Sequence, residues 1–201
     1  MLHNTLMAYL GLFASMWMVM GVIVAGIRYK GYSHSRQFLS ELGATGSPTE
    51  KFSPAINNFP LGLLFVGFGF YVSQFDKSST LIFFSGLLIV LHGLGTWIAG
   101  YFPMDADPYT KTPTFKSRIH ALAGMIMFLS LLIAPVLLVF SPLFTWGFKL
   151  FSIACVFASI HFTLSFVRSY KVKKNLGTYQ RLSYGAQLVW LSGLSLVLAA
   201  Q

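Results

Sequence analysis

The sequence predicts an all-α integral membrane protein built as a bundle of six transmembrane helices. Hydrophobic residues make up 55% of the 201-residue chain and charged residues only 9%, whereas soluble domains carry about 25% charged residues. Apolar runs of about 20 residues recur along the chain, and such a run is long enough to cross a hydrocarbon core of about 30 Å. The basic residues lie mainly between these runs, as they do in membrane proteins.

Six apolar runs have this length within a single membrane domain, residues 1–201. In order, the predicted spans are Thr5–Ile27, Asn58–Phe75, Ser79–Phe102, Ile119–Phe140, Trp146–Tyr170 and Leu182–Ala200. The first run is interpreted as a span because it lacks the basic start and the small-residue cleavage site of a secretion signal. At the second run, Asn57 is expected to cap the helix and Pro60 to occupy its first turn.

The remaining spans show features of helices that pack against one another in lipid. Glycines punctuate the second and third spans, where small residues allow two backbones to approach closely. Pro135 lies inside the fourth span and is expected to bend it, since proline removes one backbone hydrogen bond. The single cysteine, Cys155, lies in the fifth span, so no disulfide can form within the chain. The sixth span follows a basic run that ends at Arg181.

The connections between the spans differ in length and charge. The first, third and fifth, with the span ends beside them, hold twelve of the 14 Lys and Arg residues, which leaves only Lys77 and Lys149 on the other side. Because basic residues concentrate on the cytoplasmic side, we predict a multi-pass protein of the cytoplasmic (inner) membrane with both termini outside. Orientation and anionic lipid headgroups explain the net charge of +9, so no nucleic-acid partner is predicted.

The first connection contains the most polar stretch near the spans, SRQFLSELGATGSP, at Ser35–Pro48. Its residues 35–42 fit a short helix lying at the membrane interface. Phe38, Leu39 and Leu42 would face the apolar side of that helix, and Gly43 would end it.

Polar residues of the first and third connections are expected to meet on one face of the membrane. We predict that the first connection folds against the ends of the third and fourth spans and forms a polar-rimmed pocket for a membrane lipid or another amphiphile. The expected lining residues combine carboxylates, imidazoles, a hydroxyl and cations: His34, Arg36, Ser40, Glu41, Asp105, Arg118 and His120. Carboxylates and imidazoles at such a boundary are suited to proton transfer.

The same residues also have a purely structural interpretation. Glu41 would pair with Arg36 or Arg118, and Asp105 would cap the turn after Pro103, as surface charges commonly do. Two further readings stay open at this point. One is a lipid hydrolase or transferase that uses Glu41, Asp105 and His120 as acid, base or ligand. The other is an accessory subunit, without a site of its own, that binds a membrane-protein partner or a second copy of the chain.

Two histidines lie inside spans. His92 is expected about 15 Å below the end of the third span and His161 about 10 Å below the end of the fifth. Ionisable groups at that depth usually face the interior of a bundle, and similar depths allow a b-type haem with both as axial ligands. The simpler reading is a neutral histidine that is hydrogen-bonded to a serine or a carbonyl. No fixed-spacing metal motif such as HExxH or CxxC occurs, so no metal ligands are assigned.

Four short segments stand out together: SELGATGSP in the first connection, Asn57–Asn58 before the second span, GYFPMD after the third, and His120 at the start of the fourth. At these segments the chain resembles a family of prokaryotic membrane proteins known as domain of unknown function 998. The resemblance covers most of the chain. It implies a multi-span helical bundle and brings no established activity with it.

Overall fold

The computed structural model of the protein describes residues 6–201 and is all-helical over that range. Thr5, the first residue of the first predicted span, lies outside the described residues. Six helices are long and apolar enough to cross a membrane, which confirms the predicted fold class. They are α2 (Leu10–Arg28), α4 (Asn58–Phe75), α5 (Thr80–Tyr101), α6 (Phe115–Val139), α7 (Trp146–Val172) and α8 (Leu176–Ala199).

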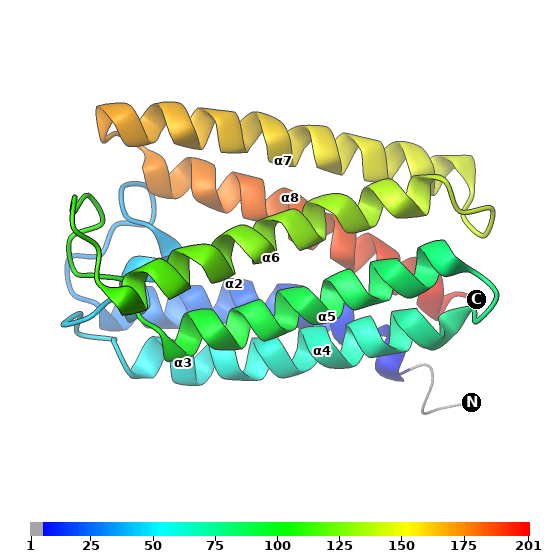
Figure 1. The fold of residues 1–201 in the computed structure, drawn as a ribbon, viewed down its shortest axis with the longest axis horizontal. Helices are drawn as coiled ribbons and strands as arrows, with labels where there is room; N and C mark the ends of the chain where they lie inside the picture. Colours follow the sequence, from blue (N-terminus) through cyan, green and yellow to red (C-terminus); the bar gives the residue numbers. More distant parts are fainter. Residues whose placement is uncertain (1–5) are drawn as a thin grey trace.

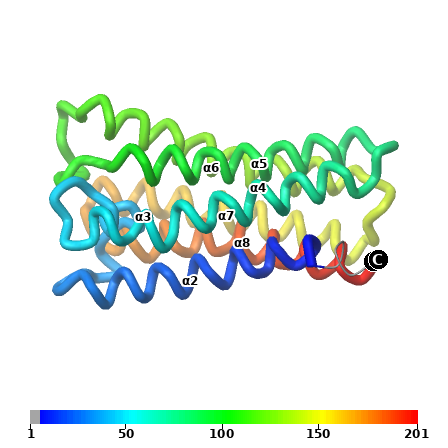
Figure 2. Tube along the Cα trace, turned by 90° about the horizontal axis from the view of Figure 1, so that it is seen from below, coloured from blue at the N-terminus to red at the C-terminus, as the bar shows by residue number. Residues whose placement is uncertain are grey.

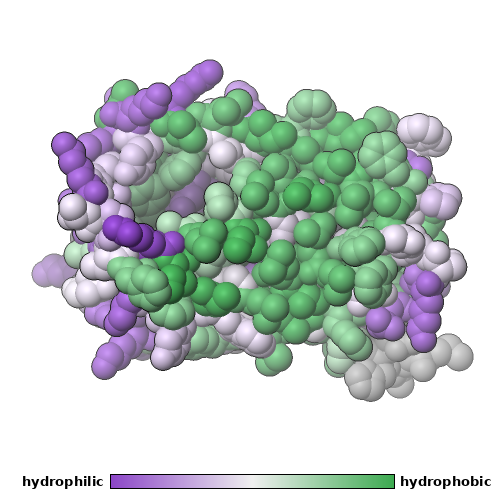
Figure 3. Space-filling view, in the orientation of Figure 1, coloured by the Kyte–Doolittle hydropathy of each residue, from purple (hydrophilic) through white to green (hydrophobic). Residues whose placement is uncertain are grey.

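The six helices run side by side along the long axis of the molecule (Figures 1 and 2). Three connections gather at one end, which we call the loop face: residues 29–57, 102–114 and 173–175. The last of these has only three residues, so the prediction of a longer fifth connection is wrong, because α7 and α8 take up most of its basic run. The turns 76–79 and 140–145 lie at the other end, where the start of α2 meets the end of α8 and the Leu12 amide donates to Ser195 Oγ at 3.1 Å. Hydrophobic side chains cover the middle of the visible surface, and hydrophilic ones gather toward its two ends (Figure 3).

Neighbouring helices contact one another in the order α2, α4, α5, α6, α7 and α8, and α8 returns to α2. The pair α4–α5 packs most closely because glycines face the opposite backbone. A Cβ atom added at Gly86 would lie 2.3 Å from the Ser73 amide nitrogen, so no side chain fits there. By contrast, α6 and α7 contact each other less and move apart toward the loop face (Figure 1).

The apolar core fills the half of the bundle that lies away from the loop face. Trp190 and Leu194 of α8 are fully buried there, packed with residues such as Phe68 and Leu131. The indole N–H of Trp190 donates to Ser152 Oγ at 3.1 Å, which satisfies its one polar atom. Tight packing in this half leaves the loop-face half as the place for a cavity.

Two helices begin earlier than their hydrophobicity predicts. Helix α6 begins at Phe115 rather than Ile119, since Thr114 caps it by accepting a hydrogen bond from the Ser117 amide at 3.3 Å. Helix α8 begins at Leu176 rather than Leu182, and its polar first turns contact the loop face instead of lipid. A search for apolar runs excludes such polar first turns.

Asn57 lies at the cap position of α4, as predicted, but the expected side-chain capping bond is absent. The Asn57 side chain makes no capping bond to α4, because the short helix α3 (Phe52–Ile56) leads almost directly into that helix. Its amide nitrogen faces Ser53 Oγ at 3.5 Å, and its Oδ1 is buried with no hydrogen-bond partner among the described residues.

The polar first connection forms a shorter helix than predicted. Within the polar stretch 35–48, only Leu39–Gly43 is helical, as the 3₁₀ helix η1. Leu42 is 1% exposed and packs on Val22 and Ala25 of α2, so this element is anchored from below. Phe38, just before it, packs edge-on against Phe166 of α7, with ring centroids 5.6 Å apart. η1 therefore forms a lid over the loop-face end of the bundle.

Candidate functional site

Beneath η1 lies a cavity of about 330 Å³, which we call the chamber. All six spanning helices, together with η1 and α3, contribute to its wall. Half of its 24 lining residues are polar, and none is Asp, Glu, Lys or Arg. The polar ones are Ser40, Ser53, Asn57, Asn58, His92, Thr96, His120, Thr163, Gln180, Ser183, Tyr184 and Gln187.

The chamber reaches the outer surface of the bundle beside α6. Gly124 both lines the chamber and is exposed, and a Cβ atom there would meet no other atom within 4 Å. Phe128, one turn further along α6, also lines the chamber and is partly exposed. Where α6 and α7 separate near the loop face, the surface is hollowed and has hydrophilic atoms at its floor (Figure 3).

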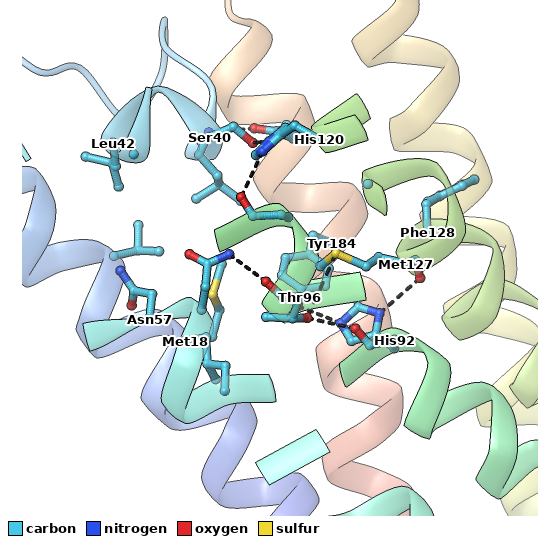
Figure 4. Close-up of a pocket in the computed structure, with 18 of the residues that line it drawn as sticks. Met18, Ser40, Leu42, Asn57, His92, Thr96, His120, Met127, Phe128 and Tyr184 are labelled. Carbon is cyan, nitrogen blue, oxygen red and sulfur yellow. Dashed lines mark hydrogen bonds between the residues drawn. The ribbon is translucent and has the colours of Figure 1, made fainter. Parts of the chain in front are cut away.

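His120 and Ser40 meet at the loop-face end of the chamber (Figure 4). His120 Nδ1 lies 3.0 Å from the Ala99 carbonyl oxygen and 2.8 Å from that of Phe102. Because carbonyl oxygens only accept hydrogen bonds, Nδ1 carries the proton of the neutral ring. Nε2, 2.9 Å from Ser40 Oγ, is therefore the acceptor, and the serine hydroxyl donates to it.

His92 lies deeper, at the floor of the chamber, and is fully buried. Its Nδ1 donates to the Met127 carbonyl at 3.0 Å, and its Nε2 accepts from the Tyr184 hydroxyl at 3.0 Å (Figure 4). Thr96, one turn further along α5, donates to the His92 carbonyl at 2.8 Å. His92 therefore matches the simpler of its two interpretations from the sequence, a neutral histidine that is hydrogen-bonded inside the bundle.

The predicted haem pair is not formed. His161 is exposed on the outer side of α7, whereas His92 faces the interior from α5 with both ring nitrogens occupied. A shared iron needs a free nitrogen from each ring, so these residues do not fit that group. The similar depths estimated from the sequence carry no information on which way each side chain points.

Glu41 stabilises the lid and does not line the chamber. One of its oxygens accepts from the Phe38 amide at 2.7 Å, and the other accepts from the Gln37 side-chain amide at 3.0 Å. Glu41 is the third residue of η1, and Phe38 is the residue before the helix. A bond from that backbone N–H to the side chain of the third helical residue is half of a capping box. Both oxygens are thus taken by Phe38 and Gln37 rather than by Arg36 or Arg118.

Asp105 has a similar structural role at the start of α6. Its carboxylate accepts from the Thr114 amide at 2.9 Å and from the Thr114 hydroxyl at 2.6 Å. These two hydrogen bonds hold the pKa of the Asp105 carboxyl below its usual range. Asp105 therefore fixes the third connection to α6, close to the structural role considered for it from the sequence, and it does not line the chamber.

The remaining predicted site residues also lie outside the chamber. His34, Arg36 and Arg118 are exposed on the loop face. The Arg118 Nε atom donates to the Pro113 carbonyl at 3.2 Å. Of the seven predicted ligand-binding residues, the structure brings only Ser40 and His120 to the chamber.

Arg181, which the sequence placed among the basic loop residues, holds the first connection to α8. One of its terminal nitrogens donates to the carbonyls of His34 at 2.6 Å and Gln37 at 2.9 Å, and the other donates to the Tyr32 hydroxyl. Burial raises the pKa of Tyr32, so its neutral hydroxyl donates onward to the Phe38 carbonyl at 2.7 Å. The guanidinium thus stabilises the segment that leads into η1.

Glycine at position 177 makes this close contact possible. A Cβ atom there would lie 2.2 Å from the Gln37 carbonyl oxygen and 2.5 Å from that of His34. On the adjoining turn, Gln180 Oε1 accepts from the Leu39 amide at 2.7 Å. The first two turns of α8 therefore position η1 directly over the chamber.

Among the polar chamber residues that the sequence analysis did not identify, three follow a pattern that is visible in the sequence. Gln180, Tyr184 and Gln187 recur at intervals of four and three, which places them on one face of a helix. The Gln187 amide donates across the bundle to the Phe128 carbonyl at 3.0 Å. A polar stripe within an otherwise apolar helix indicates an inward face that lines a polar space.

Within residues 6–201, no group of three or more His, Cys, Asp or Glu side chains is placed to hold a metal ion. The chamber thus offers hydroxyls, amides and two neutral imidazoles. These groups can hydrogen-bond an uncharged polar ligand and transfer a proton.

Comparison with known proteins places the chain in a family. Residues 12–197 match the family model described as "Protein of unknown function (DUF998)". The chain belongs to this family. The match includes every helix that lines the chamber, and it confirms the resemblance drawn from the loop motifs. No curated protein matches the chain, and no solved structure does either.

Proposed function

We propose that this multi-span membrane protein binds one amphiphilic molecule from the bilayer, with the uncharged part of that molecule in the chamber. The single observation that carries the proposal is the place where the chamber opens. Gly124 lies nine residues after the start of α6, hence about 14 Å along the helix axis. An opening at that depth faces lipid rather than water.

The size and lining of the chamber support this class of ligand. Its volume of about 330 Å³ is within the range of about 300–1,000 Å³ usual for small-molecule pockets. The twelve polar lining residues carry no fixed charge, and an ionic headgroup buried without a counter-charge is strongly unfavourable. The expected occupant is therefore a hydroxyl-, amide- or ester-bearing portion of a lipid with the start of its chain.

One buried atom also lacks a partner. Asn57, which is 5% exposed, lines the chamber, and its Oδ1 accepts no hydrogen bond within the described part of the chain. Buried acceptors normally have a donor. A ligand hydroxyl or N–H group would supply one if the Asn57 side chain turned toward it.

The first prediction concerns filling the chamber. Gly124→Leu should lower the fraction of protein that retains a lipid at least tenfold, because a large side chain at the mouth of the chamber would narrow the opening through which the ligand enters. Native mass spectrometry of protein purified in mild detergent measures this fraction. Gly185→Leu on α8 is the matched control, since its Cβ also meets open space but the residue does not line the chamber.

Two results would contradict the proposal. One is wild-type protein without any bound lipid after mild purification. The other is equal lipid retention by Gly124→Leu and Gly185→Leu.

A further inference from the structure

The Ser40–His120 contact has the geometry of a nucleophile beside its general base. The serine hydroxyl donates to His120 Nε2 at 2.9 Å, and the opposite ring nitrogen is fixed as an N–H donor to two carbonyl oxygens. In this tautomer Nε2 has a free lone pair directed at the hydroxyl proton. Both residues line the chamber, so a bound molecule can reach them.

The two carbonyls that hold His120 come from the end of α5. Ala99 lies in the last turn of that helix and Phe102 directly follows it. A helix C-terminus carries partial negative charge, so the imidazolium that forms when His120 accepts a proton is stabilised there. In this site, two carbonyls at a helix end take the place that a carboxylate has in many serine hydrolases.

The candidate donor for the developing oxyanion is the side-chain amide of Gln180, which is bonded to the residue next to the serine. Gln180 lines the chamber, and its Oε1 is held by the amide of Leu39, the residue next to Ser40. With Oε1 fixed in this way, the orientation of the side-chain amide is set, and its Nε2 has no hydrogen-bond partner among residues 6–201. A pre-oriented N–H donor of this kind stabilises the tetrahedral intermediate of acyl transfer.

We infer that Ser40 and His120 hydrolyse a carboxylic ester of a glycerolipid held in the chamber, an inference that rests on the proposed function. Ser40 Oγ attacks the ester carbonyl carbon while its proton passes to His120 Nε2. The tetrahedral intermediate collapses as the ester C–O bond breaks, and His120 returns the proton to the leaving glycerol oxygen. Water then attacks the acyl-serine with His120 as base, which releases the fatty acid and restores Ser40.

The depth of the pair suits an ester group of a membrane lipid. His120 lies five residues after the start of α6, hence about 8 Å along the axis, between the loop face and the lateral opening at Gly124. Lipid esters lie at the same boundary, between the polar headgroups and the hydrocarbon. A charged headgroup would stay among the basic residues of the loop face, and an acyl chain would extend toward α6 and α7.

The second prediction tests this inference in vesicles of dioleoylphosphatidylglycerol and dioleoylphosphatidylcholine. Wild-type protein should release oleate, and an alkyl fluorophosphonate should modify Ser40, as located by peptide mass mapping. Ser40→Ala should lose both signals. His120→Gln should slow labelling and oleate release by about 10²–10⁴-fold, the range typical of a lost general base.

Ser47→Ala is the matched control, because Ser47 belongs to the same connection but bonds to the Leu42 carbonyl and lies outside the chamber. It should be labelled and should hydrolyse lipid like the wild type. Thermal unfolding of each variant shows whether it is folded, so that a loss in His120→Gln with an unchanged melting temperature is a loss of chemistry.

The outcomes separate this inference from the proposed function. Retained lipid without labelling at Ser40 overturns the ester chemistry and leaves lipid binding in place. Labelling that persists unchanged in His120→Gln, or that falls on another serine, also overturns it. Wild-type protein that neither retains lipid nor reacts at Ser40 overturns both.

Discussion

The loop face and the chamber lie next to each other, yet they use polar side chains in different ways. On the loop face, the charged groups of Glu41, Asp105 and Arg181 bind backbone and side-chain groups of the connections. In the chamber, by contrast, the polar groups are neutral hydroxyls, amides and imidazoles. The comparison teaches that the most conspicuous charges in this membrane protein hold its lid, while the groups suited to chemistry are uncharged.

The physical reason is the difference in environment. Charge-assisted hydrogen bonds are strong, and near water they cost little desolvation, because water solvates the rest of each charged group. Inside the bundle an unpaired charge is costly, so an inward-facing polar surface is assembled from neutral groups that satisfy one another. His92 and Tyr184 show this directly, since each nitrogen of the imidazole has a protein partner.

The third prediction has the largest expected effect among those that test this comparison. Arg181→Met should lower the free energy of unfolding by about 3 kcal/mol, because hydrogen bonds to a charged group contribute about 1.5–3 kcal/mol each and are not additive. Hydrogen exchange of residues 33–38 should rise in the same variant. Arg36→Met, at an exposed arginine of the same connection, is the control and should change neither measurement.

If Arg181→Met left the exchange of residues 33–38 unchanged, the guanidinium would not be what holds the lid. The claim that charged side chains stabilise the loop face, whereas neutral ones line the chamber, would then be wrong.

The fourth prediction sharpens the contrast at a residue that the sequence analysis placed in the pocket and, in an alternative reading, in the chemistry. Glu41→Gln should lower the free energy of unfolding by about 1 kcal/mol, because a side-chain amide has only one acceptor oxygen for the two donors that the carboxylate serves, the Phe38 N–H and the Gln37 side-chain amide. Oleate release and lipid retention should stay within about twofold of the wild type, measured in the vesicles and by native mass spectrometry. A loss of oleate release in folded Glu41→Gln would instead make this carboxylate part of the chemistry.

The fifth prediction has the smallest effect and concerns pH. Partial desolvation of the largely exposed His34 ring by the surrounding connection, and secondarily the charge of Arg181, lower the pKa of His34 from its ordinary value of 6.5. The folded protein therefore binds fewer protons at His34 than the unfolded chain does, so this contribution to stability is present at neutral pH. It is lost as the pH falls below about 6.5 toward the lowered pKa.

Hydrogen exchange of residues 33–38, corrected for the intrinsic effect of pH, should accordingly increase between pH 7.5 and pH 5.5. His34→Gln should remove most of that dependence. An equal pH dependence in His34→Gln would assign it to a group other than His34.

Much of the fold followed from local patterns, but the composition of the site did not. Apolar runs predicted the six long helices, and four loop motifs predicted the family. Polarity on one face of the membrane also pointed to Ser40 and His120, which do line the chamber. The same reasoning grouped Glu41 and Asp105 with them, because it placed residues on a membrane face without resolving the few ångströms between a lid and the space beneath it.

Other residues were missed for a different reason. Arg181 was counted as a loop charge that sets orientation, and only the packed position of α8 shows it bonded to three backbone carbonyls. Gln180, Tyr184 and Gln187 formed a readable stripe, but a stripe alone does not say what it faces. His161, by contrast, was proposed as a site residue but is exposed on the outer side of α7. Its depth within the span was taken as evidence that its side chain points inward.

The number of spanning helices and their approximate positions can be read from the chain alone, because hydropathy is summed over neighbouring residues. The meeting of Ser40 with His120, 80 residues apart, depends instead on how helices pack. That contact exists because α8 holds η1 over the bundle and because α6 and α7 separate below it. Such distances between remote segments are set by side-chain packing, which no local pattern contains.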